Sequence, residues 1–203
     1  MTWIRTVGPE EAEGRLASTY KKVASADGQV DQILQAHSLR PRTLEGHLAL
    51  YKAALHTPCG LTPRERELIG TVVSMVNGCD YCVQHHRAGL ARHLGQGAAA
   101  DPELALAITT AAVSDEPHAE LTDRERAMVR YAIALTSTPS AMSREHVDAL
   151  RRAGLDDASV LDVNQVAAYF AYANRTVLGL GVSIEGEPLG LHPEEGGEDL
   201  GHG

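Results

Sequence analysis

Two cysteines and a histidine stand close together in one short stretch of the sequence. Residues 79–82 read Cys-Asp-Tyr-Cys and a histidine pair follows, so Cys79, Cys82 and His86 have the spacing i, i+3 and i+7. On a helix these three side chains share one face. A thiol becomes a good nucleophile as its thiolate, and a histidine one turn away can accept the proton. The spacing therefore predicts thiol chemistry in this segment.

The residues that precede Cys79 predict that it lies at the start of a helix. Asn77-Gly78 is typical of a helix end, and the next helix is expected from about Cys79 to Leu94, ending at Gly95. At a helix start, unpaired backbone N–H groups and the helix dipole favour an anion. Cys79 is therefore expected in surroundings that promote loss of its proton.

A carboxylate that orients His86 would complete a proton relay, and Glu67 is the candidate. Residues 62–65 form a capping box with proline at the first helical position, so a helix is expected to start there and to end at residues 77–78. The tight turn would fold this helix back against the cysteine helix. Glu67 borders its apolar stripe, where a lone glutamate needs a partner. The competing interpretation is that Glu67 is a solvated member of the charged run 64–67.

The composition favours an all-α fold. Apolar residues make up 43% of the 203 residues and aromatic residues only 4%, with alanine and leucine abundant, which suits closely packed helices. Helix-start signals recur, no segment alternates like a strand, and the helix opened at Pro9 is expected to continue through Val23 until Gly28 breaks it. We expect a single domain over residues 1–184 and a disordered, acidic, glycine-rich tail over 185–203.

One short sequence occurs twice. Residues 61–66 read LTPRER and residues 121–126 read LTDRER, and each copy would cap an amphipathic helix that another helix follows. Duplicated helical hairpins explain this repeat, with a cysteine-bearing half at about 30–115 and a cysteine-free half at about 118–184. The alternative is independent use of a common capping sequence.

Charge and cysteine content restrict the class of protein. The net charge of −9 argues against nucleic acid or an anionic membrane surface as the main partner. No apolar run approaches the about 20 residues of a membrane span, and residues 1–10 lack the apolar core of a secretory signal. We therefore expect a cytoplasmic protein, in which a close cysteine pair is more often catalytic or metal-binding than structural.

One pattern in the sequence resembles the active-site signature of the AhpD-like alkylhydroperoxidases. It consists of Glu67, eleven intervening residues, Cys79-Asp80-Tyr81-Cys82, three further residues and His86. These enzymes belong to the carboxymuconolactone decarboxylase superfamily. Flanking segments resemble its peroxidase-related branch in particular, and the resemblance extends over roughly residues 30–183. The segments that carry it are residues 37–41, 61–69, 77–79 and 169–175.

This resemblance implies an all-α, AhpD-like bundle of duplicated hairpins, assembled as a homo-oligomer that is commonly trimeric or hexameric. It implies that Cys82 attacks a hydroperoxide, that Cys79 then forms a disulfide with it, and that His86 and Glu67 relay the proton. A protein or small-molecule dithiol would restore the pair, and no haem, flavin or metal cofactor is needed. The best-studied members carry a histidine where this chain has Tyr81, which puts the full relay and the substrate preference in doubt.

Three other functions compete with peroxide reduction. Cys79, Cys82, Glu67 and one of the histidines 85–86 could bind zinc, although three ligands from one helix face suit a tetrahedron poorly. A non-redox enzyme of decarboxylase type is a second alternative, but such relatives generally lack the cysteine pair. A redox-sensing oligomer without turnover is the third.

Several residues receive structural interpretations. His85 is rotated by about 100° from His86 on a helix and is expected to pack rather than react. Cys59 stands alone in a turn, as a structural or free thiol. Asn174 and Arg175 lie in an apolar helix and need partners, for which a subunit contact is a plausible use.

Overall fold

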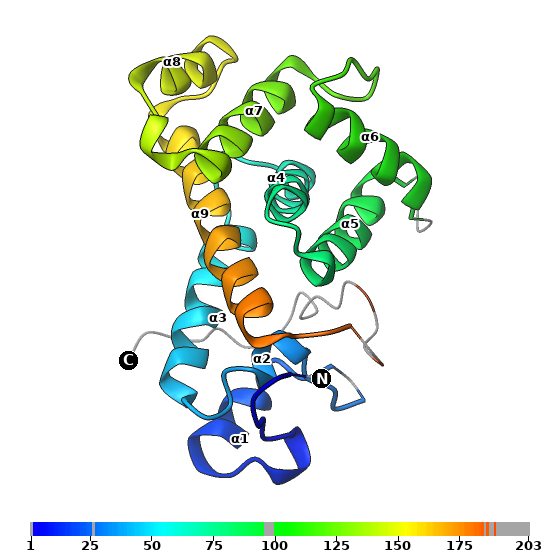
Figure 1. Cartoon of the computed structure of the whole chain (residues 1–203), viewed down its shortest axis with the longest axis vertical. Helices are drawn as coiled ribbons and strands as arrows, with labels where there is room; N and C mark the ends of the chain where they lie inside the picture. The colour runs from blue at the N-terminus through cyan, green and yellow to red at the C-terminus, as the bar shows by residue number, and fades with distance from the viewer. Residues whose placement is uncertain (1, 26, 96–99, 185, 187–188, 190–203) are drawn as a thin grey trace.

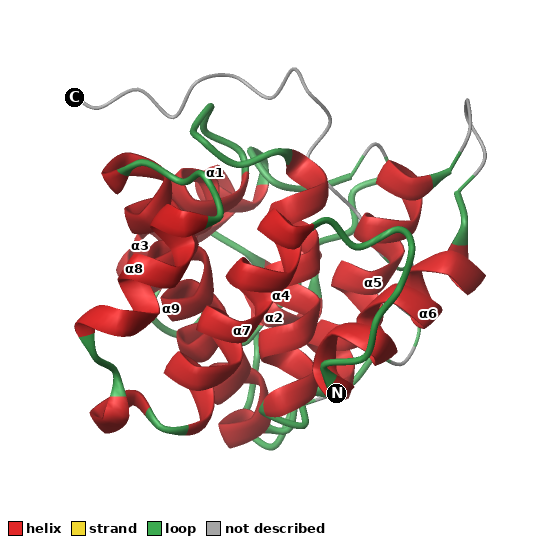
Figure 2. Cartoon of the chain, turned by 90° about the horizontal axis from the view of Figure 1, so that it is seen from above, coloured by secondary structure: helices red, strands yellow, loops and turns green. Residues whose placement is uncertain are grey.

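The computed structural model describes residues 2–25, 27–95, 100–184, 186 and 189, and within these ranges the chain is helical with no strand (Figures 1 and 2). The predicted all-α class is confirmed. Apart from residues 186 and 189, the predicted disordered tail lies outside the described residues. The elements are η1 (Pro9–Glu11), α1 (Gly14–Tyr20), α2 (Gln32–Gln35), α3 (Pro41–Leu55), α4 (Pro63–Val76), α5 (Asp80–Leu94), α6 (Pro102–Ser114), α7 (Asp123–Ser137), η2 (Pro139–Ala141), α8 (Arg144–Arg152) and α9 (Asp157–Leu180).

Helix α4 is the centre of the bundle. In Figure 1 it is seen nearly end-on, with α5, α6, α7 and α9 arranged around it and α1 to α3 at the other end of the molecule. Every residue from 65 to 74 is buried, although the sequence predicted burial of only one apolar stripe. That stripe supplies four side chains with almost no exposed surface: Leu68, Ile69, Val72 and Val73. A helix surrounded in this way needs a partner for each of its polar groups.

The ends of α4 follow the local sequence signals. The backbone N–H of Glu65 donates to Thr62 Oγ1 at 3.2 Å, and the N–H of Thr62 donates to Glu65 Oε2 at 2.7 Å, which completes the predicted capping box. At the other end, Asn77 caps the helix and Gly78 has φ +68°. This left-handed conformation suits glycine and reverses the chain within three residues, so α5 packs directly against α4.

The second copy of the repeat forms the same cap and pairs with the first. Thr122 and Glu125 make a capping box at the start of α7. Arg64 Nε lies 2.8 Å from Glu125 Oε1, and Arg124 Nε lies 2.8 Å from Glu65 Oε1. Each arginine thus neutralises the buried capping glutamate of the other copy. How the chain divides into two halves at about 30–115 and 118–184 stays a prediction.

The prediction of one helix from Pro9 through Val23 is wrong at both ends, since α1 spans Gly14–Tyr20. The chain forms the short turn η1, is extended at Ala12 and Glu13, and begins α1 at Gly14. Gly14 has φ +52°, a left-handed conformation that no continuous right-handed helix accommodates. The apolar spacing of Leu16 and Tyr20 nevertheless places both side chains in the core.

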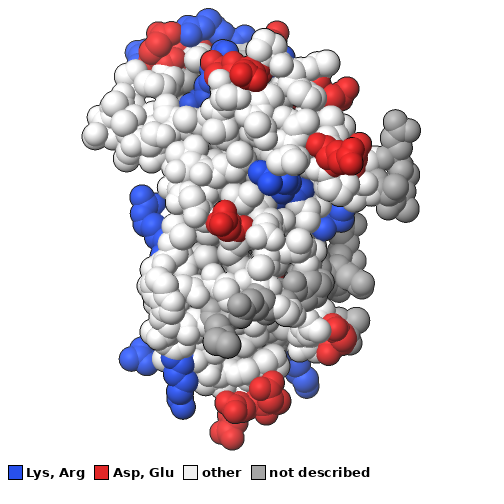
Figure 3. Space-filling model, turned by 45° about the vertical axis from the view of Figure 1, so that its right-hand side comes forward, with Lys and Arg blue, Asp and Glu red and all other residues white. Residues whose placement is uncertain are grey.

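The surface shows mixed charges. On the face drawn in Figure 3, Lys and Arg occur beside Asp and Glu toward both ends of the molecule, and no patch of one sign spans that face. None of the helices in the described ranges combines the length and apolar character that crossing a membrane requires.

Removal of one arginine from the paired caps should destabilise the fold. Arg124→Ala leaves the buried Glu65 carboxylate without its charged donor, so we expect the free energy of unfolding in urea to fall by about 1–3 kcal/mol. Arg144→Ala is the control, because its 3.6 Å contact with Asp148 is largely exposed and should change stability by about 0.5 kcal/mol or less. Equal effects of the two substitutions would contradict a structural role for the paired caps.

Candidate active site

The two cysteines of the motif lie together, buried, at the start of α5. Cys79 is the N-cap residue and has no exposed surface, and Cys82 lies in the first turn with 3% of its surface exposed. Both thiols are free, and their sulfurs are 2.7 Å apart. The helix begins at Asp80, one residue later than the sequence indicated. Cys59 is a free, exposed thiol that the structure does not bring to this pair.

The two thiols do not share their protons equally. A hydrogen bond from the Cys82 thiol lowers the pKa of Cys79, against the opposing effect of burial. Donation of that hydrogen bond to Cys79, together with burial, raises the pKa of Cys82. The first proton lost from the pair therefore leaves a thiolate centred on Cys79, with the remaining proton on Cys82.

Glu67 and His86 form a partly buried hydrogen-bonded pair across the α4–α5 interface. His86 Nδ1 lies 2.8 Å from Glu67 Oε2, and the side chains are 16% and 6% exposed, respectively. The interpretation of Glu67 as a solvated residue is therefore wrong. An ionised carboxylate only accepts hydrogen bonds, so Nδ1 donates and Nε2 of the neutral imidazole is left as an acceptor. His86 is one helical turn beyond Cys82 on α5, which is where a base for that thiol is needed.

Two glycines make room for this pair. A Cβ at Gly89 on α5 would lie 2.7 Å from the Glu67 carboxyl carbon, so only glycine lets the carboxylate reach His86. A Cβ at Gly70 on α4 would lie well inside the van der Waals radius of the Phe170 ring. Phe170 is fully buried and meets His86 edge to face, with ring centroids 4.5 Å apart. Helices α4, α5 and α9 thus position the imidazole together.

Asn174 is a site neighbour that sequence reasoning did not identify. Its side chain is completely buried, donates from Nδ2 to Ser74 Oγ at 3.1 Å and accepts from Asn77 Nδ2 at 2.9 Å. The suggestion that it forms a subunit contact is therefore wrong, because its partners belong to the same chain. Its one sequence signal was a polar side chain in an otherwise apolar helix.

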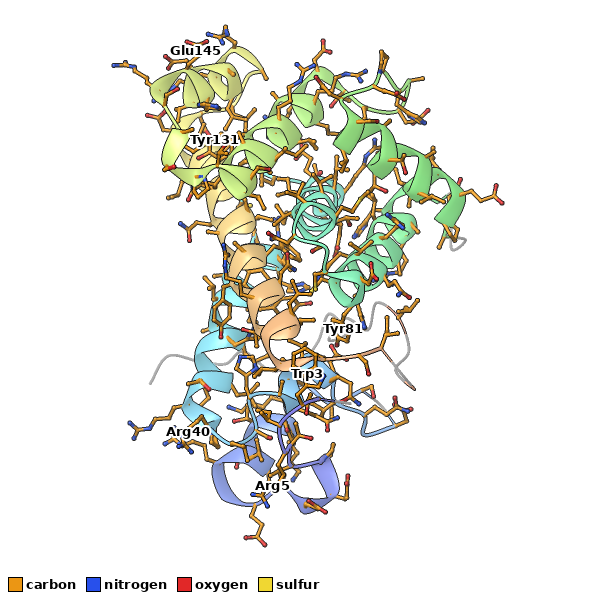
Figure 4. The ribbon with its side chains drawn as sticks, in the orientation of Figure 1. Trp3, Arg5, Arg40, Tyr81, Tyr131 and Glu145 are labelled. Atoms are coloured by element: carbon orange, nitrogen blue, oxygen red, sulfur yellow. The ribbon has the colours of Figure 1, made fainter. Side chains whose placement is uncertain are left out.

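Tyr81 and His85 lie on a face of α5 about 100° away from the relay. Their rings are in contact at a tilt of 38°, with centroids 4.5 Å apart, and both side chains are buried. The hydroxyl of Tyr81 accepts from the backbone N–H of Ile33 at 3.4 Å, and Figure 4 shows Tyr81 at the end of α5 that faces α2. Tyr81 thus connects α5 to α2, and His85 packs as the sequence suggested.

A separate aromatic cluster contains two other histidines. The rings of His37 and His47 are 4.7 Å apart, and His37 Nε2 lies 3.1 Å from the Tyr172 hydroxyl. Burial, with a smaller contribution from His37, lowers the pKa of His47 to about 3. His47 is therefore neutral at physiological pH, and this cluster is part of the packing between α3 and α9.

The arrangement of the candidate ligand side chains does not support the zinc alternative. Across residues 2–25, 27–95 and 100–184, no three or more His, Cys, Asp and Glu side chains are grouped so that they could hold a metal ion. Glu67 directs its carboxylate to His86 rather than to the sulfurs, which are engaged with each other.

Comparison with known proteins relates part of the chain to one family. Residues 41–113 match the model of the carboxymuconolactone decarboxylase family, a segment that contains Glu67, Cys79, Cys82 and His86. No curated protein matches the sequence. The chain is thus similar to this family over residues 41–113, and the likeness to solved structures concerns the fold.

Solved structures share the fold over nearly the whole chain. The AhpD-core, peroxidase-related protein from Ralstonia eutropha JMP134 is similar with a TM-score of 0.74 and 22% identity, over 90% of this chain and 91% of that one. A peroxidase-related protein from Silicibacter sp. TM1040 has a TM-score of 0.71 and 24% identity, over 82% and 83%. The debrominase Bmp8 has a TM-score of 0.69 and 18% identity, over 91% of each chain.

Closing the space at Gly89 should separate Glu67 from His86 without unfolding the protein. In Gly89→Ala the new methyl group displaces the carboxylate, so the downfield proton resonance of the His86 Nδ1–H should be lost. The better helix propensity of alanine, about 1 kcal/mol, offsets part of the disturbance. Gly46→Ala on α3 is the control, since nothing lies within 4 Å of a Cβ there. A resonance retained in Gly89→Ala would contradict this geometry.

The hydrogen bond between the sulfurs predicts how the thiols titrate. In a Cys59→Ala background, Cys82→Ala removes the donor to Cys79, so the pKa of Cys79 should rise and less thiolate should be present at neutral pH. The ultraviolet absorbance of the thiolate as a function of pH measures this change. An unchanged or lower midpoint would show that Cys82 does not stabilise the Cys79 thiolate.

Proposed function

We propose that this protein is a thiol-dependent hydroperoxide reductase. The observation that carries the proposal is the Glu67–His86 pair, formed across the α4–α5 interface one helical turn from a buried, free dithiol. An AhpD-like fold with a peroxidase-related protein among its structural neighbours supports the same function. The substrate class is an alkyl or other organic hydroperoxide.

The proposed reaction begins at Cys82. Cys82 first gives its proton to His86, and the resulting thiolate attacks one oxygen of the hydroperoxide. An S–O bond forms, the O–O bond breaks, and the leaving alkoxide takes up that proton to give an alcohol. Cys82 is then a sulfenic acid. The Cys79 sulfur attacks it, a disulfide forms and water leaves. A dithiol reductant, protein or small molecule, returns the two electrons by exchange and becomes a disulfide itself.

In this proposal His86 and Glu67 move the proton. With Nδ1 donating to the carboxylate, Nε2 can accept a proton from the dithiol and return it to the leaving oxygen. Glu67 holds the imidazole in that tautomer and stabilises the imidazolium that forms. Phe170 limits rotation of the ring by its edge-to-face contact.

The setting of the reaction is also part of the proposal. We place the enzyme in the cytoplasm as a homo-oligomer, trimeric or hexameric, that needs no cofactor and has neither nucleic acid nor membrane as a partner. Exposed apolar side chains on α9, Leu161, Tyr172 and Leu178, are available for contacts between subunits.

Single cysteine variants test the chemistry. Cys82→Ser should abolish peroxide consumption with a dithiol donor. Cys79→Ser should leave a sulfenic acid that a dimedone-type reagent traps after one turnover. Cys59→Ser is the control and should retain the parent rate, because that thiol is exposed and outside the pair. Peroxide consumption that survives both Cys82→Ser and Cys79→Ser would overturn the proposal.

The relay has its own test. His86→Gln and Glu67→Gln should each lower the rate of peroxide reduction by about 10²-fold or more and change its pH profile, while the helical circular dichroism persists. If both variants keep the rate and the pH profile of the parent, the relay assignment is wrong.

The family match leaves a non-redox reaction of decarboxylase type as the second candidate. Such a reaction would not consume reducing equivalents and would persist in a Cys79→Ser, Cys82→Ser double variant. Mass spectrometry of the two cysteines after turnover without a reductant separates the two candidates. The thiols stay reduced in a decarboxylase-type reaction and become a disulfide in peroxide reduction.

A further inference from the structure

A cavity of about 540 Å³ lies between α7 and α8, away from the candidate active site. It is partly open to solvent, and its volume is in the range of pockets that hold small molecules. Figure 4 shows Tyr131, one of its lining residues, well apart from Tyr81, which neighbours Cys82 in the sequence. Packed helices leave few voids larger than a water molecule, so a space of this size between two helices needs an explanation.

The repeat explains why the space exists on the α7 side. Helix α7 starts with the same capping sequence as α4, sixty residues later, and α8 follows α7 as α5 follows α4. At this offset Glu67 corresponds to Ala127, and Ser74 corresponds to Ala134. Both alanines line the cavity. The polar side chains with which α4 contacts α5 and α9 are thus replaced on α7 by methyl groups, which leave the space unfilled.

Helix α8 also presents small side chains to the cavity. Ala149 and Ala153, one turn apart, line it from the α8 side. The attachment of α8 to the bundle uses other residues, since Leu150 has no exposed surface and Val147 packs against the main core cluster. The cavity therefore has an apolar surface made of alanines from both helices, which suits an aromatic or short aliphatic group.

Two arginines stand on opposite sides of this apolar surface. Arg130 of α7 donates from Nε to Asp115 at 2.8 Å, and Arg152 of α8 donates from Nη2 to Glu145 at 2.6 Å. Both ion pairs are exposed, so each contributes little to stability. A guanidinium carries five N–H donors. Each arginine therefore keeps further N–H groups with which it can bind a ligand.

His146 adds a donor whose tautomer is fixed by its own helix. The backbone N–H of Ser143 donates to His146 Nδ1 at 3.1 Å, so Nδ1 is an acceptor and the neutral ring carries its hydrogen on Nε2. Among the described residues that line the cavity, only Asp123 is acidic, and its carboxylate is fully exposed beside Arg126. Donors thus predominate over acceptors around the alanines.

We propose that the α7–α8 cavity binds a small organic carboxylate, with its apolar body against the alanines and its carboxylate on Arg130 and Arg152. A planar guanidinium binds a carboxylate through two parallel N–H···O hydrogen bonds, and Nε2–H of His146 can donate to the same group. An inorganic anion would leave the alanine surface uncovered, and a neutral apolar molecule would leave the donors unused. The site shares no residue with the thiol pair or its relay, so it is independent of the proposed peroxide reduction.

Benzoate is the probe, and alanine methyl groups are the reporters. In the full chain labelled with ¹³C at its alanine methyls, benzoate should shift the resonances of Ala127, Ala134 and Ala149 saturably. The expected dissociation constant is on the order of 1 mM, as suits so small a ligand. Benzamide has the same shape without the charge, and acetate lacks the apolar body. Each should bind about tenfold more weakly or less.

Arginine variants test the contact with the carboxylate. Arg130→Gln and Arg152→Gln should each raise the dissociation constant of benzoate by about tenfold, because each removes a charged donor. Arg144→Gln is the matched control, since Arg144 is an exposed arginine of α8 that does not line the cavity, and it should leave the affinity unchanged. Parent affinity in both cavity variants would contradict the inference.

Filling the cavity is an independent test. Ala149→Leu should abolish the benzoate shifts at Ala127 and Ala134, whereas Ala53→Leu, at an exposed alanine of α3, should not. If Ala149→Leu does not fold, the arginine variants carry the test. Three results would overturn the inference: no saturable shift with benzoate, equal binding of benzamide, or shifts of these methyls with protein concentration alone, which would mean that a second copy covers the cavity.

Discussion

The structure depends on one constraint: α4 is buried on all sides and yet carries polar and charged side chains. Buried polar groups need hydrogen-bond partners, and a buried charge needs an opposite charge. Glu65 finds an arginine of α7, Glu67 finds a histidine of α5, and Ser74 finds an asparagine of α9. Each partner comes from a different neighbouring helix. The pairings therefore fix the positions of three helices around the central one.

The same constraint also determines where the candidate catalytic residues lie. The partner that satisfies Glu67 is the imidazole one helical turn from Cys82, and the partner of Ser74 is the Asn174 amide of α9. Both are polar groups that α4 requires for stability, and the imidazole is also a group that can accept a proton. Stability and reactivity are consequently coupled here, since removal of either partner leaves a buried group on α4 unsatisfied.

Features that depend on neighbouring residues in the sequence could be predicted. The capping boxes at Thr62 and Thr122 and the turn at Gly78 are local, because each uses contacts over three or four residues. The approach of Glu67 to His86 could also be anticipated, since one tight turn joins their helices. The resemblance to a known family supplied the role of each cysteine, which the spacing alone did not give.

Features that depend on distant segments could not be predicted in this way. The crossed pairs of Arg64 with Glu125 and Arg124 with Glu65 join residues about sixty positions apart, and the contact of Asn174 with Ser74 spans one hundred. Nothing in the local pattern of either segment specifies its partner. The break before Gly14 was missed for a different reason: apolar spacing continues through it, while the backbone does not.

The nearly complete enclosure of the two sulfurs has a kinetic consequence. Neither thiol offers solvent more than a few per cent of its surface, so a large folded reductant cannot bring its own sulfur into line with theirs while the helix start stays closed. Small oxidants pass such a barrier more readily than proteins do. In the proposed cycle, the disulfide would therefore be reduced slowly, at the rate at which the first turn of α5 opens locally.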